Sequence, residues 1–278
     1  GYTIESASRR GYMLQAAPDR LLPAEIRDGL NTRCFGRGEI AHFMEIDSTN
    51  ARAKEMAWNG SAEGTVVIAE KQTKGRGRRG RDWFSPVAGG IYCSLIFRPD
   101  FPPEEGPKIT FLSAVAAAEA LGRFISSGLT IKWPNDILFN GKKVAGILTE
   151  MTSEMDTIGY AVVGIGINVN TDTFPREIRQ TATSLYMETN QRFSRIAILR
   201  GYLEAQERWY DILKREGFEP ILKKWRSLAH ITDKAIRVEM VDRQIEGRVR
   251  AIDPDGVLIL EDGEGTTHRI ISGDVFFI

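Results

Sequence analysis

Arginine and glycine alternate in one short segment, and this pattern is typical of a loop that binds an anion. Residues 74–81 read KGRGRRGR, and positions 70–81 hold six basic residues against one acid. The planar guanidinium fork of arginine suits phosphate and carboxylate oxygens. Glycines let such a loop fold around its ligand and close over it as a lid. The segment predicts a lid for an anionic ligand, and the alternative is an ordinary solvated loop.

Familiar nucleotide-binding and catalytic motifs do not explain this loop. GRGRRG at 75–80 has the spacing of a dinucleotide fingerprint, but that fingerprint must open a helix, whereas RDWFSP follows here. The sequence contains neither a GxxxxGK[ST] phosphate loop nor a GxSxG nucleophile motif. His42, His230 and His268 have no metal-ligand spacing. We therefore expect catalysis by positioning and by electrostatic stabilisation of phosphates.

Two other segments carry polar side chains that suit a small ligand. Ser48, Thr49 and Asn50 stand where a helix begins, so they are natural caps that can also hydrogen-bond a ligand. In KWPND, residues 132–136, Asp136 is either an Mg²⁺ ligand or a partner for Lys132. The sequence leaves both alternatives open.

A predicted hairpin places one lysine near a glycine. Asn140-Gly141 predicts a tight turn, and Lys143 follows it. Strand alternation would put Lys143 on the same sheet face as Ala145 and Ile147, with its ammonium pointing into a pocket. Gly146 would let a ligand lie flat on the strand.

Composition and charge limit the classes of function. The 278 residues contain 37 basic and 37 acidic side chains, which argues against a general nucleic-acid or membrane binder. Cys34 and Cys93 are expected to be free thiols in a reducing cytoplasm. No apolar run approaches the roughly 18 residues of a membrane helix. The start is no signal peptide and lacks an initiator Met, which suggests that the chain begins partway through a longer protein.

Hydrophobic patterning predicts the elements that must position these residues. Strands are expected at 65–72, 89–99 and 160–170, with two more at 130–151, and helices near 19–30, after 47–49, at 108–127 and at 194–217. Residues 1–14 indicate a small hairpin around SASRRG. From residue 231 onward, short alternating strands predict a small all-β barrel of about 48 residues.

Six motifs in this order carry a resemblance to one family. They are DSTN (47–50), GRGRRGR (75–81), WFSP (83–86), KWPND (132–136), KxAGIL (143–148) and GxGIN (164–168). The chain resembles the biotin protein ligases, or biotin–acetyl-CoA-carboxylase ligases, from about residue 40 to its C-terminus. The resemblance implies an α+β fold, with a mixed sheet like that of class II aminoacyl-tRNA synthetases flanked by helices and followed by an SH3-like β-barrel. The expected domains are 15–230 (catalytic) and 231–278 (SH3-like).

The resemblance also implies the reaction and its participants. Biotin and MgATP would give biotinyl-5′-AMP and pyrophosphate, and a lysine of the biotin carboxyl carrier protein of acetyl-CoA carboxylase would then accept biotin. Residues 1–14 resemble the wing of a winged helix-turn-helix, as in the bifunctional ligase and biotin operon repressor branch. A cytoplasmic homodimer is expected, with operator DNA as a partner only where an N-terminal helix-turn-helix is present and with no membrane.

Carried over motif by motif, the resemblance assigns roles to individual residues. Lys143 and Arg78 would be catalytic, and Asp136 would serve the metal. The biotin-binding residues would be Ser48, Thr49, Asn50, Gln72, Gly75, Arg76, Gly77, Arg78, Lys143, Gly146 and Leu148. The ATP- or adenylate-binding residues would be Arg78, Arg81, Trp83, Lys132, Asn135 and Asn168. Two alternatives remain, a lipoate–protein ligase and a non-catalytic regulator that senses biotin.

Overall fold

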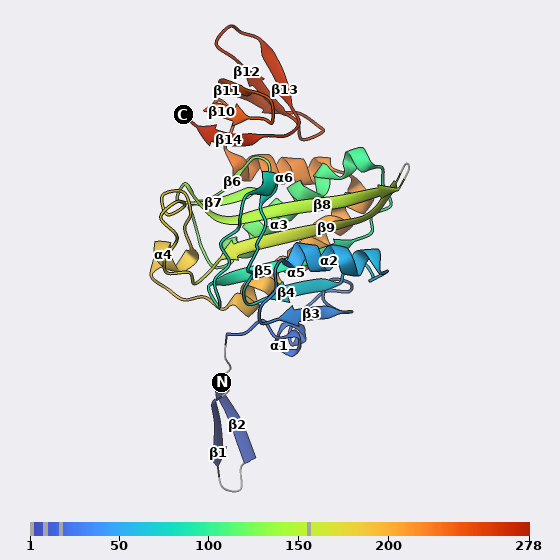
Figure 1. Ribbon diagram of the computed structural model, residues 1–278, viewed down its shortest axis with the longest axis vertical. Coiled ribbons are helices and arrows are strands. Elements are labelled where there is room, and N and C mark those ends of the chain that lie inside the picture. Colours follow the sequence, from blue (N-terminus) through green and yellow to red (C-terminus); the bar gives the residue numbers. More distant parts are fainter. Residues whose placement is uncertain (1–2, 8–10, 17–18, 155–156) are drawn as a thin grey trace.

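The structure of the chain is a computed structural model that describes residues 3–7, 11–16, 19–154 and 157–278. Figure 1 shows three parts in vertical order: an N-terminal hairpin, a central sheet with helices, and a small C-terminal sheet. None of the helices within the described residues combines the length and apolar character that a membrane span requires.

The central sheet in the described residues has seven strands in the order β3-β4-β5-β9-β8-β7-β6. Their bounds are β3 Ile40–Phe43, β4 Val66–Ala69, β5 Gly90–Phe97, β6 Leu129–Lys132, β7 Asp136–Phe139, β8 Lys142–Glu154 and β9 Thr157–Asn168. The β3–β4 pair is parallel and the other neighbours are antiparallel. The predicted mixed sheet is therefore confirmed.

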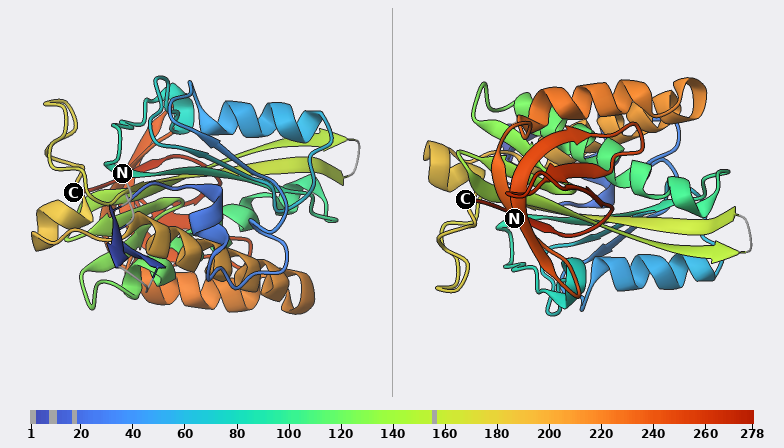
Figure 2. Two further views of the ribbon diagram at one scale, coloured as in Figure 1. Left: turned by 90° about the horizontal axis from the view of Figure 1, so that it is seen from below. Right: turned by 90° about the horizontal axis from the view of Figure 1, so that it is seen from above.

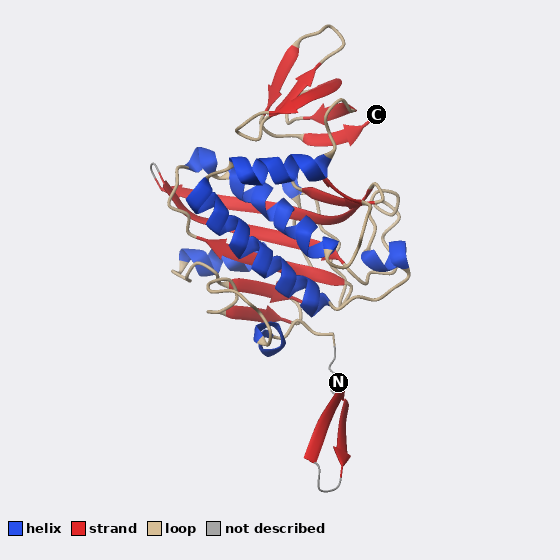
Figure 3. Ribbon diagram, turned by 180° about the vertical axis from the view of Figure 1, so that it is seen from behind, coloured by secondary structure: helices blue, strands red, loops and turns tan. Residues whose placement is uncertain are grey.

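Helices cover both faces of this sheet, but unequally. Helices α3 (Pro107–Gly122), α5 (Arg195–Glu216) and α6 (Glu219–Ala229) lie on one face, and α2 (Thr49–Trp58) lies on the other (Figures 2 and 3). The larger apolar core lies under the three helices, and a smaller core joins α2 to β4, β5 and β9. The shorter helical segments are α1 Pro23–Arg27, η1 Arg78–Gly80, η2 Pro103–Glu105 and α4 Leu185–Thr189.

Local sequence explains where the long helices begin and how they are buried. The Ser194 hydroxyl caps α5 by accepting from the amide of Ala197, and Gly217 ends it with a φ of +80°. Helix α3 is buried around most of its circumference, and its four residues 114–117 have no exposed surface. This burial confirms what its alanine-rich sequence predicts.

The C-terminal sheet comprises β10 Ala235–Glu239, β11 Gln244–Ile252, β12 Leu258–Glu261, β13 Thr267–Ile270 and β14 Asp274–Phe277. These strands pair antiparallel in the order β13-β12-β11-β10-β14. The indole N–H of buried Trp133 donates to the carbonyl of Gly256 at 3.1 Å, which ties the β6–β7 turn to this sheet. The all-β character is confirmed, and the SH3-like classification stays a prediction.

The N-terminal hairpin consists of β1 (Thr3–Ala7) and β2 (Gly11–Ala16), which pair antiparallel. The hairpin prediction is confirmed for these strands, and residues 8–10 of the predicted turn lie outside the described residues.

The prediction of two strands at 130–151 is wrong. The segment forms three strands rather than two, because residues 133–135 turn the chain between β6 and β7 and pair Lys132 with Asp136. Pro134 thus belongs to a turn, not to an extended strand. The sequence-based prediction also misses helix α6. Its amphipathic pattern is short, and Pro220, only one residue after the helix begins, makes the segment resemble a loop.

Candidate functional site

A cavity of about 520 Å³ lies on the face of the sheet that also carries α2. Gly164 and Gly166 continue the face of β9 on which α2 packs through Val162, so the cavity opens beyond the first turn of that helix. Its volume is typical of sites for small organic ligands. The predicted residues that line it are Ser48, Thr49, Asn50, Gln72, Arg76, Gly77, Arg78, Arg81, Trp83, Lys132, Asn135, Asp136, Lys143, Gly146, Leu148 and Asn168.

One end of the cavity is a neutral, hydrogen-bonded group at the start of α2. The Gln72 side-chain carbonyl accepts from both the amide (2.8 Å) and the hydroxyl (3.0 Å) of Thr49. Ser94, which sequence reasoning missed, lies beneath them, with its hydroxyl 2.8 Å from Thr49 Oγ1 and 2.6 Å from Asn50 Oδ1. Because Ser94 is fully buried within an apolar strand, its sequence context gives no sign of this role. The arrangement suits a polar, uncharged head group.

Behind this end, an ion pair fixes the orientation of Asn50. Its amide donates to Glu150 at 2.9 Å, and Glu150 also accepts from Lys54 at 2.9 Å. Burial alone would raise the pKa of Glu150, but these hydrogen bonds hold it below its ordinary value. Glu150 therefore remains a carboxylate that keeps the Asn50 carbonyl turned toward β9.

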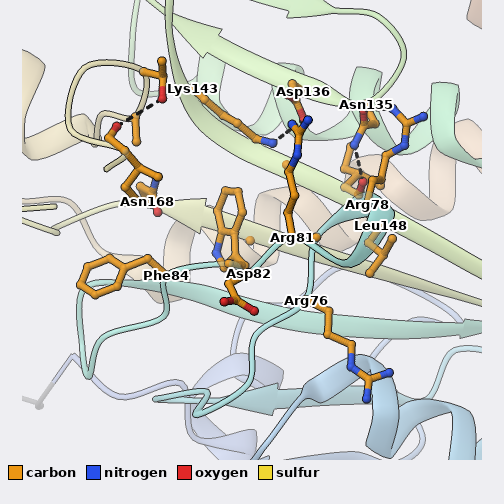
Figure 4. Close-up of a pocket in the computed structure, with 18 of the residues that line it drawn as sticks. Arg76, Arg78, Arg81, Asp82, Phe84, Asn135, Asp136, Lys143, Leu148 and Asn168 are labelled. Atoms are coloured by element: carbon orange, nitrogen blue, oxygen red, sulfur yellow. Dashed lines mark hydrogen bonds and ion pairs between the residues drawn. The ribbon is translucent and has the colours of Figure 1, made fainter. Parts of the chain in front are cut away.

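The other end of the cavity is charged. Among the residues that the structure describes, five cationic side chains and three carboxylates line the whole cavity. Lys143 Nζ lies 2.7 Å from Asp136 Oδ1 (Figure 4). Lys132 Nζ lies 3.7 Å from Asp136 Oδ2. The excess of positive charge suits an anionic ligand.

Burial leaves two of these cations poorly hydrated. It lowers the pKa of Arg78 and of Lys132, although Asp136 and Asp274 oppose the effect at both sites. Arg78 Nη1 donates to Asn135 Oδ1 at 3.0 Å, and Asn135 in turn donates to the carbonyl of Ile147 at 2.7 Å. A partly dehydrated guanidinium held in this way needs little reorganisation to bind phosphate oxygens.

The arginines of the loop do not share one direction. Arg78 and Arg81 line the charged end, whereas Arg76 extends toward α2 (Figure 4). Arg79 does not line the cavity, because its guanidinium hydrogen-bonds the C-terminal sheet. Asp274 on that sheet lies 2.7 Å from Arg81 Nη2.

Glycines form the floor beneath the loop. Gly146 and Gly166 are opposite each other on β8 and β9, and a β-carbon at Gly166 would lie 2.3 Å from Cε2 of Trp83. The Trp83 indole therefore lies directly on the backbone, and its buried N–H has no hydrogen-bond partner among the described residues. Gly75 does not line the cavity, since it is buried under the carbonyl of Trp83.

The predicted alternation around Lys143 is wrong. Lys143 shares the cavity face with Gly146, while Val144 and Ala145 do not line the cavity and pack in the larger core. A β-bulge causes the change, because Leu138 pairs with Lys143 while the adjacent Ile137 pairs with Ala145. The lysine still points into the cavity, but for a different reason.

A loop after β9 forms a wall that the sequence did not reveal. It contributes Phe174, whose ring lies 5.9 Å from that of Phe84, and it bonds to β8 through the amide of Lys143 and the carbonyl of Thr181 at 2.7 Å. Asn168 is buried, and its amide donates to the carbonyl of Thr183 at 3.0 Å. This loop has no regular hydrophobic period, so sequence reasoning had no signal for it.

The residues that line the cavity fit an Mg²⁺ ion only if the ion enters together with a phosphate ligand. Within the described ranges, no three His, Cys, Asp or Glu side chains gather where they could hold a metal. Asp136 offers one carboxylate, and it is already paired with Lys143. Mg²⁺ commonly binds proteins through one or two carboxylates and takes its remaining oxygens from phosphates and water.

Comparisons with known proteins agree with this geometry. Residues 43–168 match the Biotin/lipoate A/B protein ligase family, and residues 232–278 match the Biotin protein ligase C terminal domain. The "Bifunctional ligase/repressor BirA" of Bacillus spizizenii is 41% identical over 99% of this chain and 85% of its own length. The "Biotin--[acetyl-CoA-carboxylase] ligase" of Paracoccus denitrificans is 35% identical over 84% of this chain and 99% of its own.

A solved structure shows the same fold. The biotin protein ligase from Aquifex aeolicus, in complex with biotin and ATP, aligns with a TM-score of 0.75 and 29% identity, over 87% of this chain and 99% of its own. The matched segments contain both the glycine floor of the cavity and the C-terminal sheet that contacts its arginines. Together these matches show that the chain belongs to the biotin protein ligase family.

Proposed function

We propose that the chain is an ATP-dependent ligase that activates biotin and transfers it to a lysine of a biotin carboxyl carrier protein, that of acetyl-CoA carboxylase. The observation that carries this proposal is that one cavity is lined both by a hydrogen-bonded group of neutral side chains at the start of α2 and by a cluster of cations around Asp136 and Asp274. Biotin has a polar, uncharged ureido head and a carboxylate tail, and the tail must meet the phosphates of ATP.

The first step forms an acyl-phosphate bond. A carboxylate oxygen of biotin attacks the α-phosphorus of ATP, the bond to the β-phosphate oxygen breaks, and pyrophosphate leaves with both electrons. Lys143, Arg78 and Arg81 would stabilise the charge on the phosphoryl oxygens, and Lys132, Asn135 and Asn168 would hold the nucleotide. Asp136 would receive the Mg²⁺ that accompanies the phosphates, and this ion would neutralise part of their charge.

The second step breaks the bond that the first one forms. The amine of the carrier lysine attacks the biotinyl carbonyl carbon, AMP leaves, and the nitrogen loses a proton as the amide forms. Between the two steps the arginine loop and Trp83 would exclude water, which would otherwise hydrolyse the adenylate. Arg78 would retain the intermediate by binding its phosphate.

The remaining predicted residues would bind biotin. Asn50, Ser48, Thr49 and Gln72 would hydrogen-bond the ureido head, with Ser94 and Glu150 orienting them. Gly146 and Leu148 would line the path of the chain, and Arg76 and Gly77 would close over it. Gly75 would act indirectly by letting the loop pass close to Trp83.

The predicted domains and assembly belong to the same proposal. Residues 15–230 would form a catalytic domain related to class II synthetases, and 231–278 an SH3-like domain. Residues 1–14 would be the wing of a DNA-binding module, and the relatives named ligase/repressor support a repressor role in a protein that carries the whole module. A homodimer is part of the same proposal. The expected location is the cytoplasm.

A lipoate ligase and a non-catalytic biotin sensor are the alternatives. The match of residues 232–278 to a biotin ligase C-terminal domain supports biotin over lipoate. The test is to incubate the chain with MgATP, an apo carrier domain and either biotin or lipoate, and to follow the mass of the carrier. A gain of one biotinyl group on one lysine is expected. Lipoylation alone, or no modification, would contradict the proposal.

A further inference from the structure

The second of the two adjacent arginines in the loop contacts the C-terminal sheet instead of the cavity. The guanidinium of Arg79 donates to the carbonyls of Glu239 at 2.8 Å and Met240 at 2.7 Å. Its Nη1 also lies 3.4 Å from Asp274 Oδ2. Glu239 and Asp274 are directly paired on β10 and β14, so the planar fork of Arg79 binds two neighbouring strands at one position.

The backbone at Arg79 is shaped for this contact. Arg79 has a φ of +56° and Gly80 a φ of +74°, so two successive residues adopt the left-handed conformation. A residue with a β-carbon seldom adopts this conformation unless contacts hold it there. The turn separates Arg79, which points to the sheet, from Arg78 and Arg81, which line the cavity.

Asp274 joins these three arginines through one carboxylate. It lies 2.7 Å from Arg81, 3.4 Å from Arg79 and 3.9 Å from Arg78, and its side chain is only 13% exposed. Three guanidinium groups on four consecutive residues repel one another unless an anion lies among them. Asp274 supplies that anion from a position nearly 200 residues later in the sequence.

We infer that Arg79 and Asp274 form a latch that holds the arginine loop against the C-terminal sheet and thereby sets the positions of Arg78 and Arg81. Arg79 is a positioning residue, because it does not line the cavity and acts through the two arginines that do. Asp274 lines the cavity as well, and its proposed role is to position the same two arginines. The catalytic consequence rests on the proposed function: a loosened loop would bind ATP less well and would release biotinyl-AMP before transfer. The latch itself does not depend on that function.

The structural test measures hydrogen exchange of the ligand-free chain. Within the loop, the amide of Gly77 donates to Arg81, that of Arg81 to Arg78, and that of Trp83 to Gly75. In Arg79→Asn, asparagine tolerates the left-handed backbone but lacks the fork, so we expect these amides to exchange at least about tenfold faster. Asp274→Asn should have the same effect, and Arg79→Lys a smaller one.

A matched control separates the latch from a general loss of stability. Arg248→Asn removes another arginine of the C-terminal sheet, one that donates to the carbonyl of Asp233 at 3.1 Å, and it should leave the loop amides unchanged. If Asp274→Asn unfolds the C-terminal sheet, the exchange rates of the loop amides in Arg79→Asn alone test the latch. Loop protection that stays at the wild-type level in Arg79→Asn would overturn the latch, whether or not the chain is a ligase.

The kinetic test follows in variants whose loop protection has changed. We expect a KM for ATP about tenfold higher and free biotinyl-AMP in solution, with Arg79→Lys restoring part of the wild-type behaviour. A lower KM for ATP in Asp274→Asn would instead identify Asp274 as a competitor of the phosphates and would overturn the inference. Unchanged retention of the adenylate would overturn its catalytic part. Absence of biotin adenylation in the wild type would refute the proposed function and leave the exchange result intact.

Discussion

Gly146 and Gly166 face each other across β8 and β9, and the indole of Trp83 lies on both of them. No side chain separates the ring from the sheet, so the position of the arginine loop is set by direct contact with backbone. The ring fits more closely at Gly166, where an added β-carbon would meet it at 2.3 Å, than at Gly146, where an added β-carbon would lie 3.0 Å from the ring.

The Gly166→Ala substitution should therefore displace Trp83 and disturb the cavity. Overpacking of this kind typically costs about 1–3 kcal/mol, so we expect biotin to bind roughly tenfold more weakly or worse by isothermal titration calorimetry. Gly141→Ala in the β7–β8 turn is unsuitable as a control because its φ is +81°. Gly122→Ala, at the end of α3 with open space around it, should leave biotin affinity unchanged. Equal affinity in Gly166→Ala would show that Trp83 is not positioned by this contact.

Ser94 should orient the neutral end of the cavity without touching the ligand. Ser94→Ala leaves the Asn50 carbonyl oxygen buried without this partner, at a cost of about 1–3 kcal/mol, which should weaken biotin binding about tenfold. The control is Ser113→Ala in α3, whose hydroxyl bonds Ile109 and Gln206 in the core. That variant should lose stability but keep its affinity for biotin. Normal biotin binding by the Ser94→Ala protein would show that Ser94 does not orient the site.

The effect of replacing Lys143 distinguishes a catalytic ligase from a non-catalytic biotin sensor. Removing a group that stabilises transition-state charge commonly costs about 10²- to 10³-fold in rate, and we expect Lys143→Ala to lose that much adenylation activity. Its biotin affinity should change by much less. Lys142→Ala is the matched control, because Lys142 is the exposed neighbour that does not line the cavity. If Lys143→Ala adenylates biotin at the wild-type rate, the catalytic assignment is wrong.

The acid stability of the fold should depend on Glu70. Glu70 is buried beside Arg195, with 2.8 Å between Glu70 Oε2 and Arg195 Nη1, and it accepts the amide of Leu21. Burial alone would raise the pKa of Glu70, but Arg195 and these hydrogen bonds hold it below its ordinary value of 4.5. The stabilisation is therefore complete above that pH and is lost as the pH falls toward the pKa of the folded state.

Glu70→Gln should accordingly lower the free energy of unfolding at pH 7 by about 3–5 kcal/mol, the usual cost of breaking a buried ion pair. Urea unfolding from pH 7 to pH 3 should show the difference from wild type shrinking below about pH 4.5. The exposed Glu264 provides the control, since Glu264→Gln should follow the wild-type curve. A Glu70→Gln deficit that does not change with pH would exclude this ion pair as its cause.

Much of the fold could be predicted because local signals agree with the tertiary structure. Ser194 and Gly217 mark the ends of α5, and the alanine-rich sequence of α3 matches its deep burial. The errors arise where tertiary contacts override local pattern. The bulge beside Lys143 reverses the expected alternation, and the turn at 133–135 is held partly by the bond from Trp133 to Gly256, which is distant in sequence.

Part of the site could likewise be predicted from the sequence, and part could not. Motif residues such as Asn50, Gln72 and Lys143 line one cavity because each lies at the end of an element that the sequence indicates. Asp274 could not be found in this way, because it is a single acid on a distant strand. The sequence also gives no sign that Arg79 points in a different direction from its neighbouring arginines. The left-handed turn that redirects it cannot be recognised within a run of arginines.

Biotin adenylation by this cavity is tested by ATP–pyrophosphate exchange on the purified chain, with biotin and lipoate supplied separately at equal concentration. We predict exchange with MgATP that depends on biotin, with little or none from lipoate. Exchange would show that the carboxylate of biotin attacks the α-phosphate of ATP and that this step runs in both directions. No exchange with biotin, despite measurable biotin binding, would refute the ligase function and indicate a sensor without catalytic activity.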